Sequence, residues 1–363
     1  MADWLNRLAA SLADNGHEPR TFTAGSGQII VLDHGARVLG CTLPGVDENL
    51  FWHNPRLEDA SDAGTPLHEA GGLIGGDRIW IAPENGYMWP DLEAARTDPQ
   101  GTYQLPTRMD PSEWGPIEEG DDHVVLGTTM ALTDHRSERS VSLNLSREIT
   151  IIDRPHGLPD SLACASFAIR NDLSLIEGDP EAVAGAWDIL QLPPTGTLIC
   201  PTVMPVQGQP RSYYDPFGDK HVQVDPHCVR FLIDSRRRIK MGLRAEHTNG
   251  RMGYYRALPD GQASLIVRVF LPQPGEAYVD MPRMTDDTFG GDALQAYNDD
   301  GTATGEGPGH CFGEMEYHDP AIVVGAGPAL RTGSCVTHVI AGAEGLVRQA
   351  GRMLLGVDVQ PIA

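Results

Sequence analysis

The chain has 363 residues, 40% of them apolar, and its 50 acidic against 27 basic side chains give a net charge of −23 at pH 7. A negative field of this size repels phosphate backbones and anionic lipids, so nucleic acid and membrane surfaces are not expected as partners. No stretch reaches the roughly 20 apolar residues of a membrane-spanning helix, and the length suffices for one large domain or two ordinary ones.

The N-terminal segment and the cysteines both indicate a cytoplasmic protein. Trp4, Leu5, Leu8 and Leu12 recur at helical spacing within residues 3–14, and polar residues interrupt any apolar run that a signal peptide would need. We therefore expect a short amphipathic helix there. The six cysteines are scattered, with no C-x-x-C pair and no compact Cys/His cluster. This usage fits a reduced compartment and offers no structural zinc site.

Short β-rich segments follow one another along the chain. The clearest is 141–151, where a row of apolar residues that also contains Arg147 alternates with polar ones, the period-two pattern of a half-buried strand. The other segments are 28–32, 37–43, 123–127, 164–170, 264–271, 321–324 and 334–340. The 41 glycines and 28 prolines supply many turns and leave room for helices only at 3–14, near 90–96 and at 342–354.

These features predict an all-β, mainly antiparallel protein in which two large sheets form a sandwich with short terminal helices. We expect an N-terminal helical extension (1–24), one β domain (25–345) and a C-terminal tail or helix packed on that domain (346–363). No internal repeat or low-complexity linker interrupts this plan. The basic run 236–238 is interpreted as an exposed strand end or turn in preference to an anion site.

The segment GGLIGGDRIWIAPENG (71–86) is the first candidate site. Arg78, Trp80 and Glu84 share one strand parity, whereas Ile79 and Ile81 take the other, so the first three can face away from the apolar pair. A guanidinium, an indole and a carboxylate suit sugars, which offer hydroxyl groups and C–H faces. The alternative is an ion pair between Arg78 and Glu84, with Trp80 as ordinary packing.

The segment GHCFGEMEYHDPA (309–321) is the second candidate site. Glu314, Glu316 and His318 share one strand face, and Met315 and Tyr317 share the other. Two carboxylates and an imidazole are costly to bury without partners, so they either face solvent or form a site. Such a trio could supply a general base and a general acid, or bind a divalent metal. The alternative is an exposed, polar edge strand.

Two further residues, Trp187 and Gln191, are candidates for ligand contact, with core packing and a strand-end position as the alternative reading. The chain has no G-x-S-x-G elbow, Walker loop, H-E-x-x-H helix or Rossmann glycine pattern. We therefore expect no nucleotide chemistry and no cofactor, and we name no metal ligands, although the question of a divalent cation stays open.

Five segments, in this order, carry a resemblance to a known family: 27–55, 75–84, 146–153, 167–172 and 312–321. They resemble the galactose-mutarotase-like, or aldose 1-epimerase-like, β-supersandwich superfamily. The similarity is greater still to an uncharacterised-domain branch with a GG-x-R-x-W-x-APE motif and a late E-x-E strand. The resemblance spans roughly residues 25–345 and implies an antiparallel supersandwich with a polar, sugar-binding concave face.

The resemblance also implies roles for particular residues. Glu314 occupies the place of the late-strand glutamate that acts as base in aldose 1-epimerases, and Arg78 matches an arginine that lies in the pocket of related sugar-phosphate mutarotases. The N-H-x-Y-F-N-L segment, which supplies a catalytic histidine in typical members, is absent, and its nearest equivalent, 183–190, has no histidine. His318 is therefore assigned as the acid from strand parity alone.

Three functional hypotheses follow. The leading one is an isomerase that acts at an anomeric or sugar-ring proton, with Glu314 as base and Arg78, Trp80, Glu84 and Glu316 lining the pocket. The second is a polysaccharide lyase or glycosidase on the same fold, and the third is a non-catalytic sugar-binding or regulatory protein. All three predict a small sugar or oligosaccharide as partner, and none predicts the oligomeric state.

Overall fold

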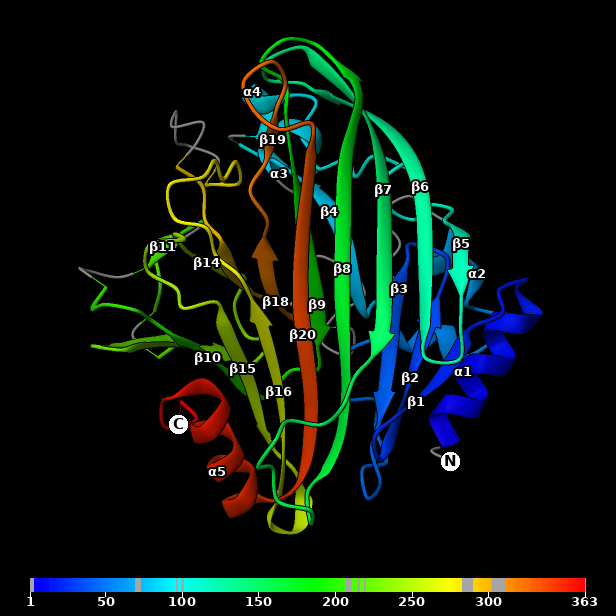
Figure 1. The fold of residues 1–363 in the computed structure, drawn as a ribbon, viewed down its shortest axis with the longest axis vertical. Helices are drawn as coiled ribbons and strands as arrows, with labels where there is room; N and C mark the ends of the chain where they lie inside the picture. Colours follow the sequence, from blue (N-terminus) through cyan, green and yellow to red (C-terminus); the bar gives the residue numbers. More distant parts are fainter. Residues whose placement is uncertain are drawn as a thin grey trace.

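Two large antiparallel sheets form the body of the protein (Figure 1), so the predicted all-β sandwich is confirmed. The computed structural model describes residues 3–68, 73–95, 97–98, 101–206, 210–213, 216–218, 220–282, 290–301 and 311–362. The first sheet has the order β1 (Arg20–Ala24), β2 (Gly27–Leu32), β3 (Arg37–Thr42), β4 (Asp77–Ala82), β9 (Val183–Leu192), β18 (Gly313–His318), β17 (Leu294–Asn298), β14 (Ile239–Leu243) and β11 (Arg211–Ser212), and β19 (Ile322–Val323) also pairs with β9.

The second sheet lies against one face of the first. Its order is β12 (Val222–Asp225), β13 (Cys228–Ile233), β10 (Gly196–Pro201), β15 (Arg251–Ala257), β16 (Gln262–Phe270), β20 (Leu330–Ala343), β8 (Ala163–Gly178), β7 (Arg139–Ile151), β6 (His123–Asp134) and β5 (Gly115–Glu119). The alternation predicted for 141–151 is confirmed within β7, where Val141, Leu143, Leu145 and Arg147 are buried. The basic run 236–238 lies in the turn between β13 and β14, as expected.

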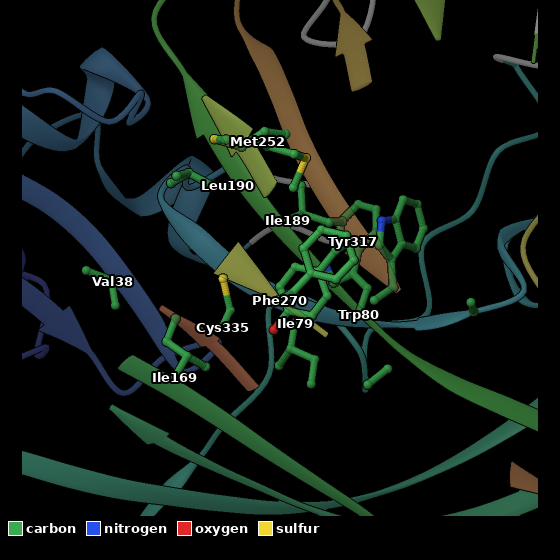
Figure 2. Packing of buried hydrophobic residues seen from close by; sticks show 14 of the residues in the cluster. Val38, Ile79, Trp80, Ile169, Ile189, Leu190, Met252, Phe270, Tyr317 and Cys335 are labelled. Carbon is green, nitrogen blue, oxygen red and sulfur yellow. The ribbon is translucent and has the colours of Figure 1, made fainter. Parts of the chain in front are cut away.

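The main hydrophobic core fills the space between the sheets. Figure 2 shows Ile79, Leu190 and Tyr317 of the first sheet in one cluster with Ile169, Phe270 and Cys335 of the second. The rings of Phe270 and Tyr317 stack with centroids 4.9 Å apart. One face of β4, β9 and β18 is therefore turned toward the second sheet, and their alternate residues must point away from it.

Helices decorate this sandwich. α1 (Asp3–Asp14) and α5 (Glu344–Leu355) lie on different sides of the molecule, α1 beside the first sheet and α5 beside the second (Figure 1). Both were expected, as was α4 (Leu92–Ala95), whereas α2 (Gly64–His68) and α3 (Glu84–Tyr87) are too short to show a helical period in the sequence. Two 3₁₀ turns, η1 (Pro55–Glu58) and η2 (Pro259–Gly261), complete the structure.

The N-terminal helix packs through the apolar residues that predicted it. Its buried side chains form a cluster with three residues of β2 and β3, with Leu57 of η1 and with the segment after η1; the members are Trp4, Leu5, Leu8, Leu12, Ile30, Leu32, Leu39, Leu57, Ala63, Leu67 and Ile74. The first sheet begins at Arg20, inside the segment expected as a helical extension, because β1 pairs with β2 from Arg20 to Ala24.

Candidate functional site

Three neighbouring strands, β4, β9 and β18, bring the predicted site residues onto one surface. Trp80, Trp187 and His318 form one row across the strands, and Gln191 is paired with Glu314 in another. Ile189 pairs with Arg78 on one side and with Glu316 on the other, which forms a third row between the first two. Because the odd-numbered neighbours on β4 and β18 point into the core, this row pattern places all these side chains on the opposite face of the first sheet, which we call the site face.

Glu314 is held on the site face by two donors. Arg78 Nη2 and Gln191 Nε2 each donate a hydrogen bond of 3.0 Å to Glu314 Oε1. The Glu314 side chain keeps 9% of its surface exposed, whereas the Arg78 side chain keeps 3%. The sequence placed these three residues in the site, and the structure joins them across three strands. The result is a carboxylate of fixed orientation that solvent can still reach.

Arg78 and Trp80 share a second carboxylate that the sequence did not single out, Asp110. Trp80 Nε1 donates to Asp110 Oδ2 at 2.8 Å, and Arg78 Nε lies 3.7 Å from the same oxygen. Arg37 also pairs with Asp110, and the Arg78 guanidinium lies 4.3 Å from the Trp80 ring centroid. Burial acts to raise the pKa of Asp110, but Arg37 and Arg78 outweigh it and the net shift is downward. Asp110 is therefore an ionised anchor for the side chains of β4.

Glu316 has a different environment from Glu314, two residues away. It is fully buried, and its Oε2 accepts hydrogen bonds from Trp187 Nε1 at 2.7 Å and from Lys240 Nζ at 3.1 Å. Burial raises the pKa of Glu316 to about 8, although Lys240 acts in the opposite direction. Burial thus favours the protonated form of Glu316, whereas Glu314 is paired with a guanidinium.

Lys240, on β14, is a site residue that the sequence reasoning missed. Its Nζ lies 3.7 Å from Glu84 Oε2 and 4.4 Å from the centroid of the Trp187 ring. The chain has only two lysines, Lys220 and Lys240, and the second is in the apolar run IKMGL. Lysine is rare in this chain, and Lys240 is surrounded in the sequence by apolar residues; this combination could have identified Lys240 as a site residue.

His318 is buried against an aromatic ring. Its imidazole stacks on Trp187 with centroids 5.3 Å apart and an angle of 20° between the planes. Burial, reinforced by the nearby charge of Lys240, lowers the pKa of His318 well below its ordinary value. The imidazole is therefore neutral at physiological pH, a form with one hydrogen-bond donor and one acceptor.

Glu84 lies in the site but not on the strand that was predicted to carry it. β4 ends at Ala82, and Glu84 is the first residue of α3. The strand parity assigned to Glu84 was thus wrong, because the chain turns after Pro83 into a short helix. The Glu84 carboxylate reaches the site face beside Lys240, and its backbone N–H donates to Asp280 Oδ1 at 2.8 Å.

The polar wall continues beyond β18 through residues that carried no recognisable motif. Gln295 Nε2, on β17, donates to Asp280 Oδ2 at 2.7 Å and to Tyr213 Oη at 2.6 Å. Tyr213 Oη in turn donates to Asp292 Oδ2 at 2.8 Å, and Arg211 Nη2 lies 2.7 Å from Asp292 Oδ1. This network connects the end of the first sheet to the loop residue Asp280 beneath Glu84.

The position of β18 decides between the two readings of its polar face. The strand lies between β9 and β17, and Gly313 to His318 are all buried. The alternative of an exposed, polar edge strand was therefore wrong. Trp187 and Gln191 likewise lie on a strand that is buried along its whole length, and both side chains donate hydrogen bonds to the glutamates of β18.

Several buried polar atoms on the site face have no hydrogen-bond partner among the described residues. They are Nε and Nη1 of Arg78, Oε1 of Gln191, Oε1 of Gln295, Oε1 of Glu316 and both ring nitrogens of His318. Buried polar groups in folded proteins are nearly always hydrogen-bonded, and an unpaired one costs about 1–3 kcal/mol. This set includes donors as well as acceptors, so it is suited to a ligand that can both donate and accept.

Neither a metal centre nor a membrane segment emerges from the described residues. Within these ranges, no three His, Cys, Asp or Glu side chains are placed so that they could hold a metal ion. No helix in the described part of the chain is both long enough and apolar enough to cross a membrane. None of the six cysteines, all of which lie in the described ranges, forms a disulfide, and all are buried.

The solved structures that match this chain include three proteins named for aldose epimerases or galactose mutarotase. A protein of Escherichia coli K12 provisionally named an aldose 1-epimerase has a TM-score of 0.49 and 12% identity, with 89% of this chain and 99% of that chain covered. A galactose mutarotase related enzyme of Lactobacillus acidophilus has a TM-score of 0.42 and 9% identity, covering 88% and 97%. A GalM/aldose epimerase homologue of C. elegans has a TM-score of 0.43 and 9% identity, covering 89% and 98%.

The comparison with protein families covers almost the whole chain. No curated protein matches it. The model of a family of unknown function, DUF6786, matches residues 20–363, which include both sheets and every residue of the site face. The chain therefore belongs to the family of unknown function DUF6786.

Proposed function

We propose that the protein binds a sugar on the site face and catalyses opening and reclosing of the sugar ring at its anomeric carbon. The observation that carries this proposal is the set of buried donors and acceptors on Arg78, Gln191, Gln295, Glu316 and His318 that have no partner among the described residues. Each sugar hydroxyl can donate one hydrogen bond and accept others, so a polyhydroxylated ring can satisfy such a mixed set. A ligand that could only donate or only accept hydrogen bonds would leave part of this set unpaired.

Two carboxyl groups in different environments, two residues apart on β18, support acid–base chemistry. Glu314 accepts hydrogen bonds from Arg78 and Gln191 and keeps a small exposed fraction, and we assign it as the base. Glu316 is fully buried, its pKa is raised to about 8, and it holds a proton at neutral pH, which suits an acid. Two carboxyl groups held in different environments are a recurring arrangement in acid–base enzymes.

Strand geometry favours Glu316 over His318 as the acid. Cα atoms rise about 3.3 Å per residue along a strand, so His318 lies about 13 Å from Glu314 and Glu316 about 7 Å from it. The base and the acid must address the anomeric hydroxyl and the ring oxygen, which are bonded to the same carbon. We therefore propose Glu316 as the acid and assign His318 to hydrogen bonding with a sugar hydroxyl.

The orientation of Glu316 fits a donor. Its Oε2 is occupied by Trp187 Nε1 and Lys240 Nζ, both of which donate. The proton is therefore carried by Oε1, which has no partner among the described residues. In the proposed reaction Glu314 accepts the proton of the anomeric hydroxyl while Glu316 donates its proton to the ring oxygen. The C–O ring bond breaks, the aldehyde rotates, and the reverse transfers close the ring on the other face.

The experiment is a proton NMR measurement of anomer exchange with a panel of reducing sugars. Freshly dissolved single anomers would be mixed with the protein, with and without EDTA, and the approach to equilibrium followed. We expect acceleration by the wild-type protein and a loss of about 10²–10⁴-fold in Glu314→Gln, the usual contribution of a positioned acid or base. Glu177→Gln, an exposed glutamate on β8 of the other sheet, is the matched control and should behave as wild type.

Other results would replace the proposal. New olefinic signals with uronate oligosaccharides would identify a lyase, and cleaved products would identify a glycosidase. Saturable binding without chemical change would identify a sugar-binding protein. Full activity in Glu314→Gln would exclude Glu314 as the base.

A further inference from the structure

A buried cluster of four charged side chains lies between the sheets, directly behind the site face. Its members are Asp77 on β4, Asp188 on β9, Arg147 on β7 and Arg268 on β16, and their side chains are 0% exposed. Arg147 Nη2 lies 2.6 Å from Asp77 Oδ1, and Arg147 Nη1 lies 2.6 Å from Asp188 Oδ2. Arg268 Nη2 lies 3.1 Å from Asp77 Oδ2 and also pairs with Asp188. We call these four residues the ion cluster.

The ion cluster connects the second sheet to each of the three strands that carry the site. Both arginines bridge Asp77 to Asp188, so each spans the gap between β4 and β9. Arg268 Nη1 also donates to the backbone carbonyl of Met315 at 3.4 Å, the residue between Glu314 and Glu316. Its guanidinium lies 5.1 Å from the Tyr317 ring centroid on the same strand. One guanidinium of the second sheet therefore contacts β4, β9 and β18 together.

Each aspartate of the cluster is next in sequence to a residue of the site face. Asp77 precedes Arg78, and Asp188 follows Trp187. Because consecutive strand residues point to opposite faces, a shift of β4 or β9 by one residue would exchange the aspartate with its neighbour. An aspartate held between two arginines on one face thus determines which side chain stands on the other face.

Net stability does not by itself require this arrangement. Removing four charges from water is costly, and replacing a buried ion network with apolar residues of similar volume is often neutral or stabilising. Loss of one member, in contrast, leaves an uncompensated buried charge. The best-supported role of such a buried network is to select a single strand register. The ion cluster has that geometry, since its contacts are made to several strands at once.

We propose that the ion cluster is a positioning device that holds β4, β9 and β18 in the register and at the separation that the site face requires. Its four residues are positioning residues that act through Arg78, Trp187 and the two glutamates of β18. The catalytic consequence rests on the function proposed above, whereas the geometric consequence does not. An experiment can therefore measure the geometric and the catalytic consequences separately.

The test uses the full chain with all four residues replaced by apolar ones, Asp77→Leu, Arg147→Met, Asp188→Leu and Arg268→Met together. The first readout is the indole N–H signals in a ¹H–¹⁵N spectrum, with Trp187 assigned by Trp187→Phe and Trp80 by Trp80→Phe. These two N–H groups donate to Glu316 and Asp110, so their shifts report the site geometry without any substrate. The second readout is the separation of kcat from KM for anomer exchange.

We expect the apolar variant to fold with thermal stability equal to or above that of the parent, and to show displaced or broadened Trp80 and Trp187 indole signals. Its kcat should fall at least tenfold, with a smaller change in KM. Leu145→Met, a core substitution on the same strand as Arg147 without a change of charge, should leave both indole signals in place. A folded apolar variant with parental indole signals overturns the proposal, whether or not the protein proves to be an isomerase.

Arg147→Lys serves if the apolar variant does not fold. It keeps the charge of the cluster but removes the planar fork with which Arg147 reaches Asp77 and Asp188 through separate nitrogens. We expect this variant to fold and to show indole displacements in the same direction. Indole signals and kcat equal to those of the parent would overturn the proposal here as well.

Discussion

Replacing Glu316 with glutamine separates the proposed acid from its structural role. Glutamine has nearly the same shape as a protonated glutamate, and its carbonyl oxygen can still accept from Trp187 and Lys240. It cannot give up a proton as an acid. We therefore expect Glu316→Gln to fold and to bind sugar, but to lose about 10²–10⁴-fold in kcat for anomer exchange.

The magnitude of the stability change follows from the raised pKa. The pKa of Glu316 is raised from its ordinary value of 4.5 to about 8 in the native protein. The unfolded chain therefore releases this proton at a much lower pH than the native protein does. The native state binds more protons in this window, and the free energy of unfolding falls as pH rises from 4.5 to about 8. At 1.36 kcal/mol per unit, the cost is about 3 kcal/mol at pH 7 and about 5 kcal/mol above pH 8.

Glutamine removes this cost because it does not ionise. Glu316→Gln should therefore be about as stable as the parent near pH 4.5 and progressively more stable than it toward pH 9. Urea unfolding at several pH values measures the difference, and anomer exchange over the same range measures the activity. The parental rate should decline as pH rises through about 8. A stability difference independent of pH would refute the buried proton, and undiminished activity would refute Glu316 as the acid.

Three further predictions concern other parts of the molecule. Lys240→Met removes the cation that lowers the pKa of Glu316, so the alkaline decline of the anomer-exchange rate should move to higher pH; a decline at the parental pH would contradict this. Asp319→Asn should stabilise the protein by a few kcal/mol at pH 9 and little at pH 4 in urea unfolding, because burial raises the pKa of Asp319 to about 8 and the native state loses stability above the ordinary value of 3.8. Leu8→Ala, at a fully buried position of α1, should cost about 2–5 kcal/mol of unfolding free energy, and a cost below 1 kcal/mol would mean that the helix is not part of the cooperative fold.

The fold and half of the site follow from local patterns in the sequence. Strands with one apolar face, such as β7, alternate visibly, and the terminal helices carry their apolar stripe openly. The strands that carried no such signal, including β9 and β17, are buried on both faces, so their side chains show no alternation. The charged residues of β4 and β18 were identifiable because polar side chains at alternate positions of a strand are costly to bury unless they have hydrogen-bonding partners.

Local patterns in the sequence are enough to predict the β architecture, the polar face of β18 and the residues of β4 that accompany it. The partners of these residues follow only from the packing of distant strands. Lys240, Asp110 and the ion cluster reach the site through contacts between strands that are far apart in sequence, and hydrogen bonds across a sheet depend on strand order and register. Arg147 shows both sides of this division. Its place on the apolar face of a strand was visible in the sequence, but its role came from two aspartates that the opposite sheet presents to it.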